Sequence, residues 1–198
     1  MQFESFFLKL KHWQVFLIIV GIPIILMSII LFDPELVISL PPYSIFLLTL
    51  FIILGMQGWM YSVGSFLYKS MPDHVTKPNF SKFQVLVLIT VIKGITEQFM
   101  ESYLSFEPTP AFSFTSRVVD FSITVSMCVF LGRAIGTVEK GRTVTFSDSV
   151  GDFFRFSFIF IGIWTLQPRI NHLYNNGDDL EIYDPDRPLD QMPDSRLN

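Results

Sequence analysis

The chain has little of what most disulfide-bonded and catalytic proteins depend on. Cys128 is the only cysteine among 198 residues, which excludes an internal disulfide, a C-x-x-C redox pair and a multi-cysteine zinc site. The three histidines are far apart and show no metal-ligand spacing. The sequence also contains no nucleophile elbow, P-loop, zincin motif or dinucleotide-binding glycine motif. We therefore predict a protein that is not an enzyme and that uses no metal or cofactor.

Charge is also missing from long stretches of the chain. Residues 13–32 and 43–68 contain no charged side chain, and about 20 apolar residues are enough to cross the hydrocarbon core as a helix. Residues 83–106 and 114–136 are apolar apart from a few ionisable groups. The 22 phenylalanines and the 50% hydrophobic content are typical of a bilayer protein. We predict an all-α, polytopic membrane helical bundle with four transmembrane helices at these positions.

A fifth apolar run is shorter than the other four. Its apolar centre, residues 153–166, would be about 21 Å long as a helix, which is less than the hydrocarbon core. We predict a fifth, short membrane helix over residues 150–170 that either crosses the bilayer tilted or enters and returns. The bundle then covers residues 1–171.

The remaining residues, 172–198, form an acidic tail. They hold seven Asp and Glu against two Arg, with three prolines and few apolar side chains. Such a composition cannot bury enough apolar surface to fold alone. The sequence therefore predicts a disordered tail that would fold only on a partner.

The basic residues predict the topology, because short loops rich in Lys and Arg stay in the cytoplasm. Residues 33–42 contain no basic residue, so we place them outside and the N-terminus inside. The fifth run is followed by Arg169 and then by the acidic tail, which this rule hardly weighs, so the side of the C-terminus stays open. The cytoplasmic basic residues are Lys9, Lys11, Lys69, Lys77, Lys82, Arg133, Lys140 and Arg142.

Ionisable residues inside the third and fourth predicted helices are costly in a membrane and usually have a partner or a function. Lys93, Glu97 and Glu101 recur every four residues, so they share one helical face. If the two helices are antiparallel about a turn near residue 109, Arg117 lies opposite Glu101 and Asp120 lies within one residue of Glu97.

This predicted cluster has two interpretations. In the first, Lys93 pairs with Glu97 or Asp120, Arg117 pairs with Glu101, and the ion pairs fix how the helices dock. In the second, two carboxylates share a proton and form an ion or proton site that is reached from outside.

Polar residues at the end of the last predicted helix form a second candidate site. They follow a Phe-rich run, and Arg and Trp commonly sit at headgroup level. The alternative to such interfacial anchoring is a docking surface for a partner protein or an anionic lipid. The residues concerned are Trp164, Gln167, Arg169 and Asn171.

Several short motifs resemble a family of small bacterial multi-pass membrane proteins that has no assigned activity. The motifs are Lys11-His12-Trp13-Gln14, Tyr61-Ser62-Val63-Gly64, residues 136–148 and residues 162–171. The resemblance implies a bacterial cytoplasmic (inner) membrane and transfers no site residue. Its most specific part is residues 144–171, and Lys93 and Glu97 lie outside the matching motifs.

These features lead to two functional hypotheses. The first is an accessory or scaffold subunit of a membrane complex, which contacts its protein partner through the tail or the last helix. The alternative is a small transporter or ion-conducting oligomer that uses the buried charges. Most of the basic residues lie in or beside the predicted cytoplasmic segments, as expected for a membrane protein, and give no sign of nucleic-acid binding. The oligomeric state stays open.

Overall fold

The computed structural model describes residues 2–32, 41–104 and 108–175. These residues form helices and connecting turns, and no strand occurs in the described ranges. The all-α fold is therefore confirmed. Four helical stretches are long and apolar enough to cross a membrane, which agrees with the four predicted transmembrane helices.

The long helices have slightly different bounds from those predicted. They are α5 (Pro42–Lys69), α6 (Phe80–Leu104) and α7 (Pro110–Lys140). Helix α7 begins four residues before the predicted 114, because Pro110 takes its first position and Thr109 Oγ1 accepts a hydrogen bond from Phe112 N at 3.3 Å. It ends where Gly141 adopts a left-handed conformation, with φ of 60°. The predicted end of the third helix at residue 106 lies outside the described residues.

The first membrane helix is not regular. It consists of α2 (His12–Phe16), a π-helical turn η1 (Leu17–Gly21) and α3 (Ile22–Phe32). Pro23 has no N–H to donate to the carbonyl one turn earlier, and the Ile22 N–H reaches back to Leu17 O instead. A wider turn therefore lies next to the Gly and Pro pair at this point in the helix.

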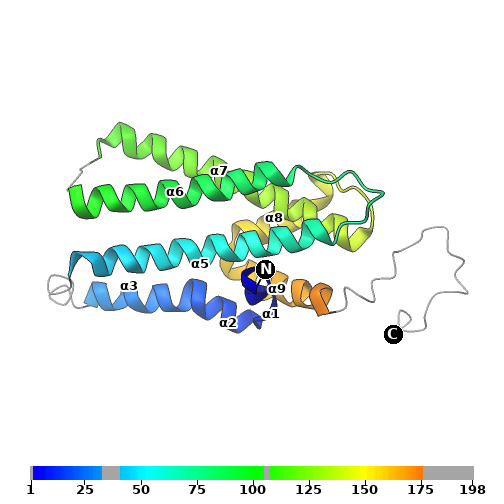
Figure 1. Ribbon diagram of the computed structural model, residues 1–198, viewed down its shortest axis with the longest axis horizontal. Coiled ribbons are helices and arrows are strands. Elements are labelled where there is room, and N and C mark those ends of the chain that lie inside the picture. The colour runs from blue at the N-terminus through cyan, green and yellow to red at the C-terminus, as the bar shows by residue number, and fades with distance from the viewer. Residues whose placement is uncertain (1, 33–40, 105–107, 176–198) are drawn as a thin grey trace, which may run out of the picture.

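The helices form a bundle whose two ends differ (Figure 1). Helices α6 and α7 run antiparallel, α5 lies beside α6, and the π-helical turn η1 that precedes α3 contacts α5. The basic end holds the helix termini Lys69, Phe80 and Lys140, and the turn end holds Phe32, Pro42, Leu104 and Pro110. Three short helices gather toward the basic end: α1 (Gln2–Lys9), α8 (Val150–Ser157) and α9 (Ile159–Asn175).

The hydrophobic core occupies the half of the bundle near the basic end. Its fully buried side chains include Trp59, Phe83, Leu131, Ile135 and Ile163. Helix α1, which the sequence did not predict, joins this core by burying Phe7 and Leu8 against α5 and α9. Toward the turn end the apolar side chains are mostly exposed, among them Ile24, Ile25, Phe32, Leu47, Phe51, Ile92, Phe114 and Phe121. Among the described residues, the buried core is therefore concentrated in the half near the basic end.

The predicted fifth helix over residues 150–170 is wrong as a single helix. Helices α8 and α9 are separate and their axes differ by 116°. The break lies at Phe158, which is not helical, and Gly162 makes it possible because a Cβ there would collide with the carbonyl of Arg155. Gly132 lets α7 approach α8 closely, since its Cβ would lie 2.9 Å from Phe153 N. Backbone approach, rather than side-chain packing, sets this part of the fold.

The two helices of the fifth run form a bent pair rather than one tilted helix. Helix α8 begins beside the last turn of α7, where Lys140 Nζ donates to Asp148 O at 3.4 Å. Helix α9 comes back to the same level, because Arg169 contacts both Glu139 on α7 and Asp152 in the first turn of α8. The two helices therefore form a hairpin, here called the re-entrant hairpin (residues 150–175), with both ends at the basic end.

The predicted boundary at residue 172 also falls inside a helix. Helix α9 continues through Asn175, buries Leu173 and brings Tyr174 against Phe66, with ring centroids 5.5 Å apart. The rest of the predicted tail, residues 176–198, lies outside the described residues.

Candidate functional site

The predicted charged residues of α6 and α7 meet in one cluster. Lys93 Nζ lies 2.8 Å from Glu97 Oε2 and 2.8 Å from Asp120 Oδ2. The Lys93–Glu97 contact follows from the i, i+4 spacing on α6, and the Lys93–Asp120 contact joins α6 to α7. We call Lys93, Glu97 and Asp120 the charged triad. One lysine is thus shared between two carboxyl groups.

Ser116 belongs to the same site, although sequence reasoning missed it. Its Oγ donates a hydrogen bond to Glu97 Oε1. Ser116 lies one turn before Asp120 on α7, and that i, i+4 spacing is the signal that could have identified it. Both oxygens of Glu97 are therefore engaged.

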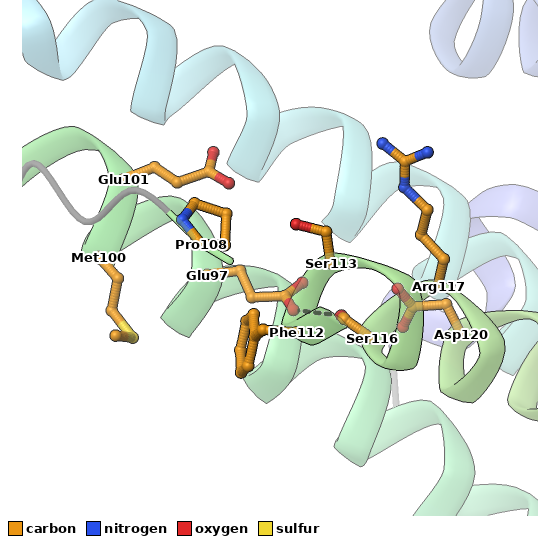
Figure 2. Close-up of a pocket in the computed structure, with 9 residues that line it drawn as sticks. All are labelled: Glu97, Met100, Glu101, Pro108, Phe112, Ser113, Ser116, Arg117 and Asp120. Carbon is orange, nitrogen blue, oxygen red and sulfur yellow. Dashed lines mark hydrogen bonds between the residues drawn. The ribbon is translucent and has the colours of Figure 1, made fainter. Parts of the chain in front are cut away.

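A pocket of about 180 Å³ adjoins the charged triad at the turn end. Figure 2 shows its lining side chains, and every described lining residue belongs to α6, to α7 or to Pro108 in the turn between them. Glu101 and Arg117 face this pocket, yet no ion pair joins them within the described part of the chain. The predicted Arg117–Glu101 contact is therefore not formed, although both residues lie at the predicted site.

The charged triad lies well inside the helices and is only partly covered. Lys93 is 11 residues before the end of α6, or roughly 16 Å along the axis at 1.5 Å per residue. The side chains of Lys93, Glu97 and Asp120 are 20%, 34% and 46% exposed. Toward the basic end the buried side chains of Phe83, Met127 and Leu131 fill the bundle. The pocket is thus accessible from the turn end and stops at the packed core.

The second candidate site is not an open surface, and its prediction needs correction. Gln167 is fully buried. Its Oε1 accepts from Trp59 Nε1 at 2.8 Å, and its Nε2 donates to Phe7 O at 2.9 Å. Asn171 Nδ2 donates to Leu10 O at 3.0 Å. These two side chains attach α9 to α5 and to the segment between α1 and α2.

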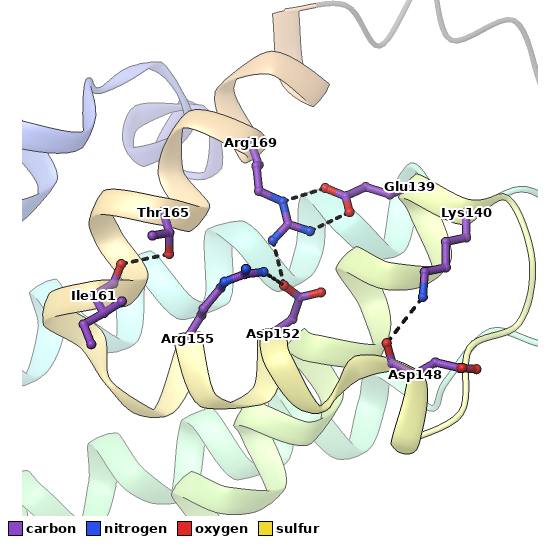
Figure 3. A network of polar contacts seen from close by, with 8 residues as sticks. All are labelled: Glu139, Lys140, Asp148, Asp152, Arg155, Ile161, Thr165 and Arg169. Atoms are coloured by element: carbon purple, nitrogen blue, oxygen red, sulfur yellow. Dashed lines mark hydrogen bonds and ion pairs between the residues drawn. The ribbon is translucent and has the colours of Figure 1, made fainter.

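Arg169 is likewise occupied inside the molecule (Figure 3). Its Nε and Nη2 contact the two carboxylate oxygens of Glu139, and its Nη1 lies 2.6 Å from Asp152 Oδ1. Arg155 pairs with the same Asp152 oxygen at 2.7 Å. A bidentate contact of this kind fixes orientation, so Arg169 holds the re-entrant hairpin against α7 rather than facing a partner.

Trp164 differs from the other three residues of that predicted surface. It is 47% exposed, and its ring packs beside His12 and Phe16, with centroid distances of 4.8 and 5.5 Å. Trp164 alone keeps the accessibility that a docking role or an interfacial position requires.

The loops at the basic end are tied together by polar contacts. His74 Nε2 lies 3.0 Å from Gly141 O, and Thr76 N donates to Thr143 Oγ1 at 3.1 Å. Lys77 Nζ hydrogen-bonds Asp73 Oδ1 at 2.9 Å, which lowers the pKa of the Asp73 carboxyl. Within the described ranges, no group of three or more His, Cys, Asp or Glu side chains is arranged to hold a metal.

Comparison with known proteins adds no further assignment. No family model, no curated protein and no solved structure matches this chain. The charged triad and the packing around it therefore carry the functional argument.

Proposed function

We propose that this chain is a non-enzymatic integral membrane protein that serves as an accessory or scaffold subunit of a membrane complex. One observation carries the proposal. Lys93, Glu97 and Asp120 are partly exposed well inside helices that are long and apolar enough to cross a membrane. Charge that faces hydrocarbon is costly and is normally covered by protein or water. A partner helix against the turn-end half of α6 and α7 would cover it.

The contrast between the two halves of the bundle supports the same proposal. Near the basic end, buried hydrogen bonds and ion pairs hold the helices together. Toward the turn end, α3 has exposed Ile24, Ile25 and Phe32 and packs sparsely on other helices. One half is complete as a monomer, and the other offers surface to a partner.

The location and orientation belong to this proposal. The basic residues of the loops gather at one end, which favours that end as the cytoplasmic side and a cytoplasmic N-terminus. The re-entrant hairpin then puts Asn175 on the cytoplasmic side as well. The motif resemblance favours a bacterial inner membrane.

Native mass spectrometry of the tagged protein, purified from its own membrane in mild detergent, tests the proposal. We expect a second polypeptide in fixed stoichiometry. Ser113→Trp, which fills the pocket, should release it. Thr115→Trp is the matched control, since Thr115 is exposed on the same helix and does not line the pocket. A monomer without any bound polypeptide would contradict the accessory role.

The same cluster supports one alternative, a small transporter or ion-conducting oligomer. Two carboxylates that share one lysine beside a pocket are a recurrent arrangement for binding an ion or a proton inside a membrane. Under this alternative, Glu97→Gln with Asp120→Asn abolishes proton or ion flux in proteoliposomes. Flux that is unchanged in the double variant eliminates the alternative and leaves the accessory role untouched.

A further inference from the structure

A second cavity lies at the basic end of the bundle, on the other half of α6 and α7. It encloses about 730 Å³ between residues 78–86 and residues 126–133. We call it the basic-end groove. Its floor includes the stacked rings of Phe83 and Phe130, whose centroids are 4.5 Å apart, and its side wall includes Val85, which is 52% exposed. The groove is therefore mainly apolar and open along the side of the bundle.

Two cations line this apolar groove. Lys82 lies in the first turn of α6, and Arg133 lies seven residues, or roughly 10 Å, before the end of α7. No Asp or Glu lines the groove, and neither cation forms an ion pair within the described part of the chain. Arg133 Nε donates to Val144 O at 3.2 Å, which holds the guanidinium in place and leaves its terminal nitrogens toward the groove without a described acceptor.

Neutral polar groups complete the same end of the groove. Asn79 and Ser81 lie beside Lys82. Asn79 Oδ1 accepts from Lys82 N at 3.0 Å, so its amide NH₂ is the part that can donate to a ligand. The end near Lys82 is thus rich in donors, whereas the part deeper along the helices is lined by apolar side chains and Ser126.

We propose that the basic-end groove binds one anionic glycerophospholipid. Its phosphate lies between Lys82 and Arg133, and one acyl chain follows the wall formed by Phe83, Val85, Val129 and Phe130. An elongated apolar surface that ends in cations at headgroup level matches a lipid, while a free phosphate would leave the apolar surface unused. This inference is independent of the proposed partner at the turn end, because the two cavities share no lining residue.

Native mass spectrometry of the full-length protein, titrated with dioleoyl phosphatidylglycerol or dioleoyl phosphatidylcholine, tests this site. We expect one phosphatidylglycerol to bind about tenfold more tightly than phosphatidylcholine, because each basic residue near an anionic headgroup contributes several-fold in affinity. Lys82→Gln with Arg133→Gln should reduce phosphatidylglycerol binding to the phosphatidylcholine level. Lys9→Gln with Lys11→Gln removes the same charge from the same end and should leave the preference intact.

A second pair of variants separates the groove from a general charge effect. Ser126→Trp fills the deeper part of the groove with both cations present, so it should also lower phosphatidylglycerol binding about tenfold at an unchanged melting temperature. Ser122→Trp, one turn away and outside the groove, should bind like the wild type. Three results would overturn the proposal. The protein could bind the two lipids with equal affinity, the two double charge variants could lose phosphatidylglycerol binding equally, or a second copy of the chain could occupy this face.

Discussion

Lys93 pairs with two carboxylates. Its removal therefore leaves both of them without their shared positive partner. In Lys93→Met the carboxylates of Glu97 and Asp120 lose their shared cation and repel each other inside the bundle. We expect a loss of about 1–3 kcal/mol of unfolding free energy, less than for a fully buried pair because both carboxylates are partly exposed. The melting temperature in mild detergent measures it.

The compensating variant gives this prediction its control. Adding Glu97→Gln and Asp120→Asn to Lys93→Met removes the uncompensated charge and should restore most of the lost stability. If the triple variant is as unstable as Lys93→Met alone, electrostatic pairing is not the reason for the effect.

Gln167 supplies a second prediction at the scale of single residues. Gln167→Leu keeps the volume but removes the acceptor of the buried Trp59 Nε1. A buried polar group left unpaired costs about 1–3 kcal/mol, so the melting temperature should fall. Thr165→Ala on the same helix is the control, because its hydroxyl is exposed and bonds only Ile161 O. Adding Trp59→Phe removes the unpaired indole N–H and should recover part of the lost melting temperature. If the effects of the two substitutions simply add, the hydrogen bond between Trp59 and Gln167 does not explain the loss.

The sequence could predict some of these contacts and not others, for a physical reason. The Lys93–Glu97 contact is local and follows from helical spacing, and the approach of Asp120 follows from one short turn. Arg117 and Glu101 lie nearer that turn, where both line the pocket without forming an ion pair with each other. The partners of Gln167 are 108 and 160 residues away in the chain, and no local pattern indicates such distant contacts.

Among the elements, the re-entrant hairpin depends on the glycine that turns it. In Gly162→Ala the added methyl group would collide with the carbonyl of Arg155, so the bend between α8 and α9 must open. We expect a fall in melting temperature that corresponds to about 1–3 kcal/mol. Gly151→Ala in α8 is the matched control, since no atom lies within 4 Å of its Cβ position, and alanine favours a helix over glycine. Equal destabilisation by both would show that close approach at Gly162 is not the cause.

Sequence reasoning identified the long helices and missed the shorter elements. A run of about 20 apolar residues in a membrane forms a spanning helix. The ends of α5, α6 and α7 therefore agree with the predicted ends to within a few residues. The apolar centre of the fifth run, residues 153–166, was too short for a straight span, and composition alone could not choose between a tilted helix and a hairpin. Helix α1 has only eight residues, too few for a reliable periodic signal.

For the whole molecule, the hairpin predicts that both described ends of the chain lie on one side of the membrane. Cysteine variants labelled with a membrane-impermeant maleimide test this in oriented vesicles. Asn175→Cys should react from the same side as Arg142→Cys, and Ala111→Cys from the opposite side. Native Cys128 is fully buried and should stay unlabelled. Reaction of Asn175→Cys from the side of Ala111→Cys would mean that α9 spans the bilayer.

The hydrogen bonds of Gln167 and Asn171 also have a consequence for the timing of assembly. The carbonyls of Phe7 and Leu10 emerge early in synthesis, but the amides that bind them follow 160 and 161 residues later. At 5–20 residues per second this is a delay of roughly 10–30 s. During that interval the growing chain can insert its long helices in lipid, but α1 has no amide from α9 to dock against. The half of the bundle near the basic end closes only when α9 arrives, so a ribosome that stalls before Gln167 leaves the earlier described helices made and that half open.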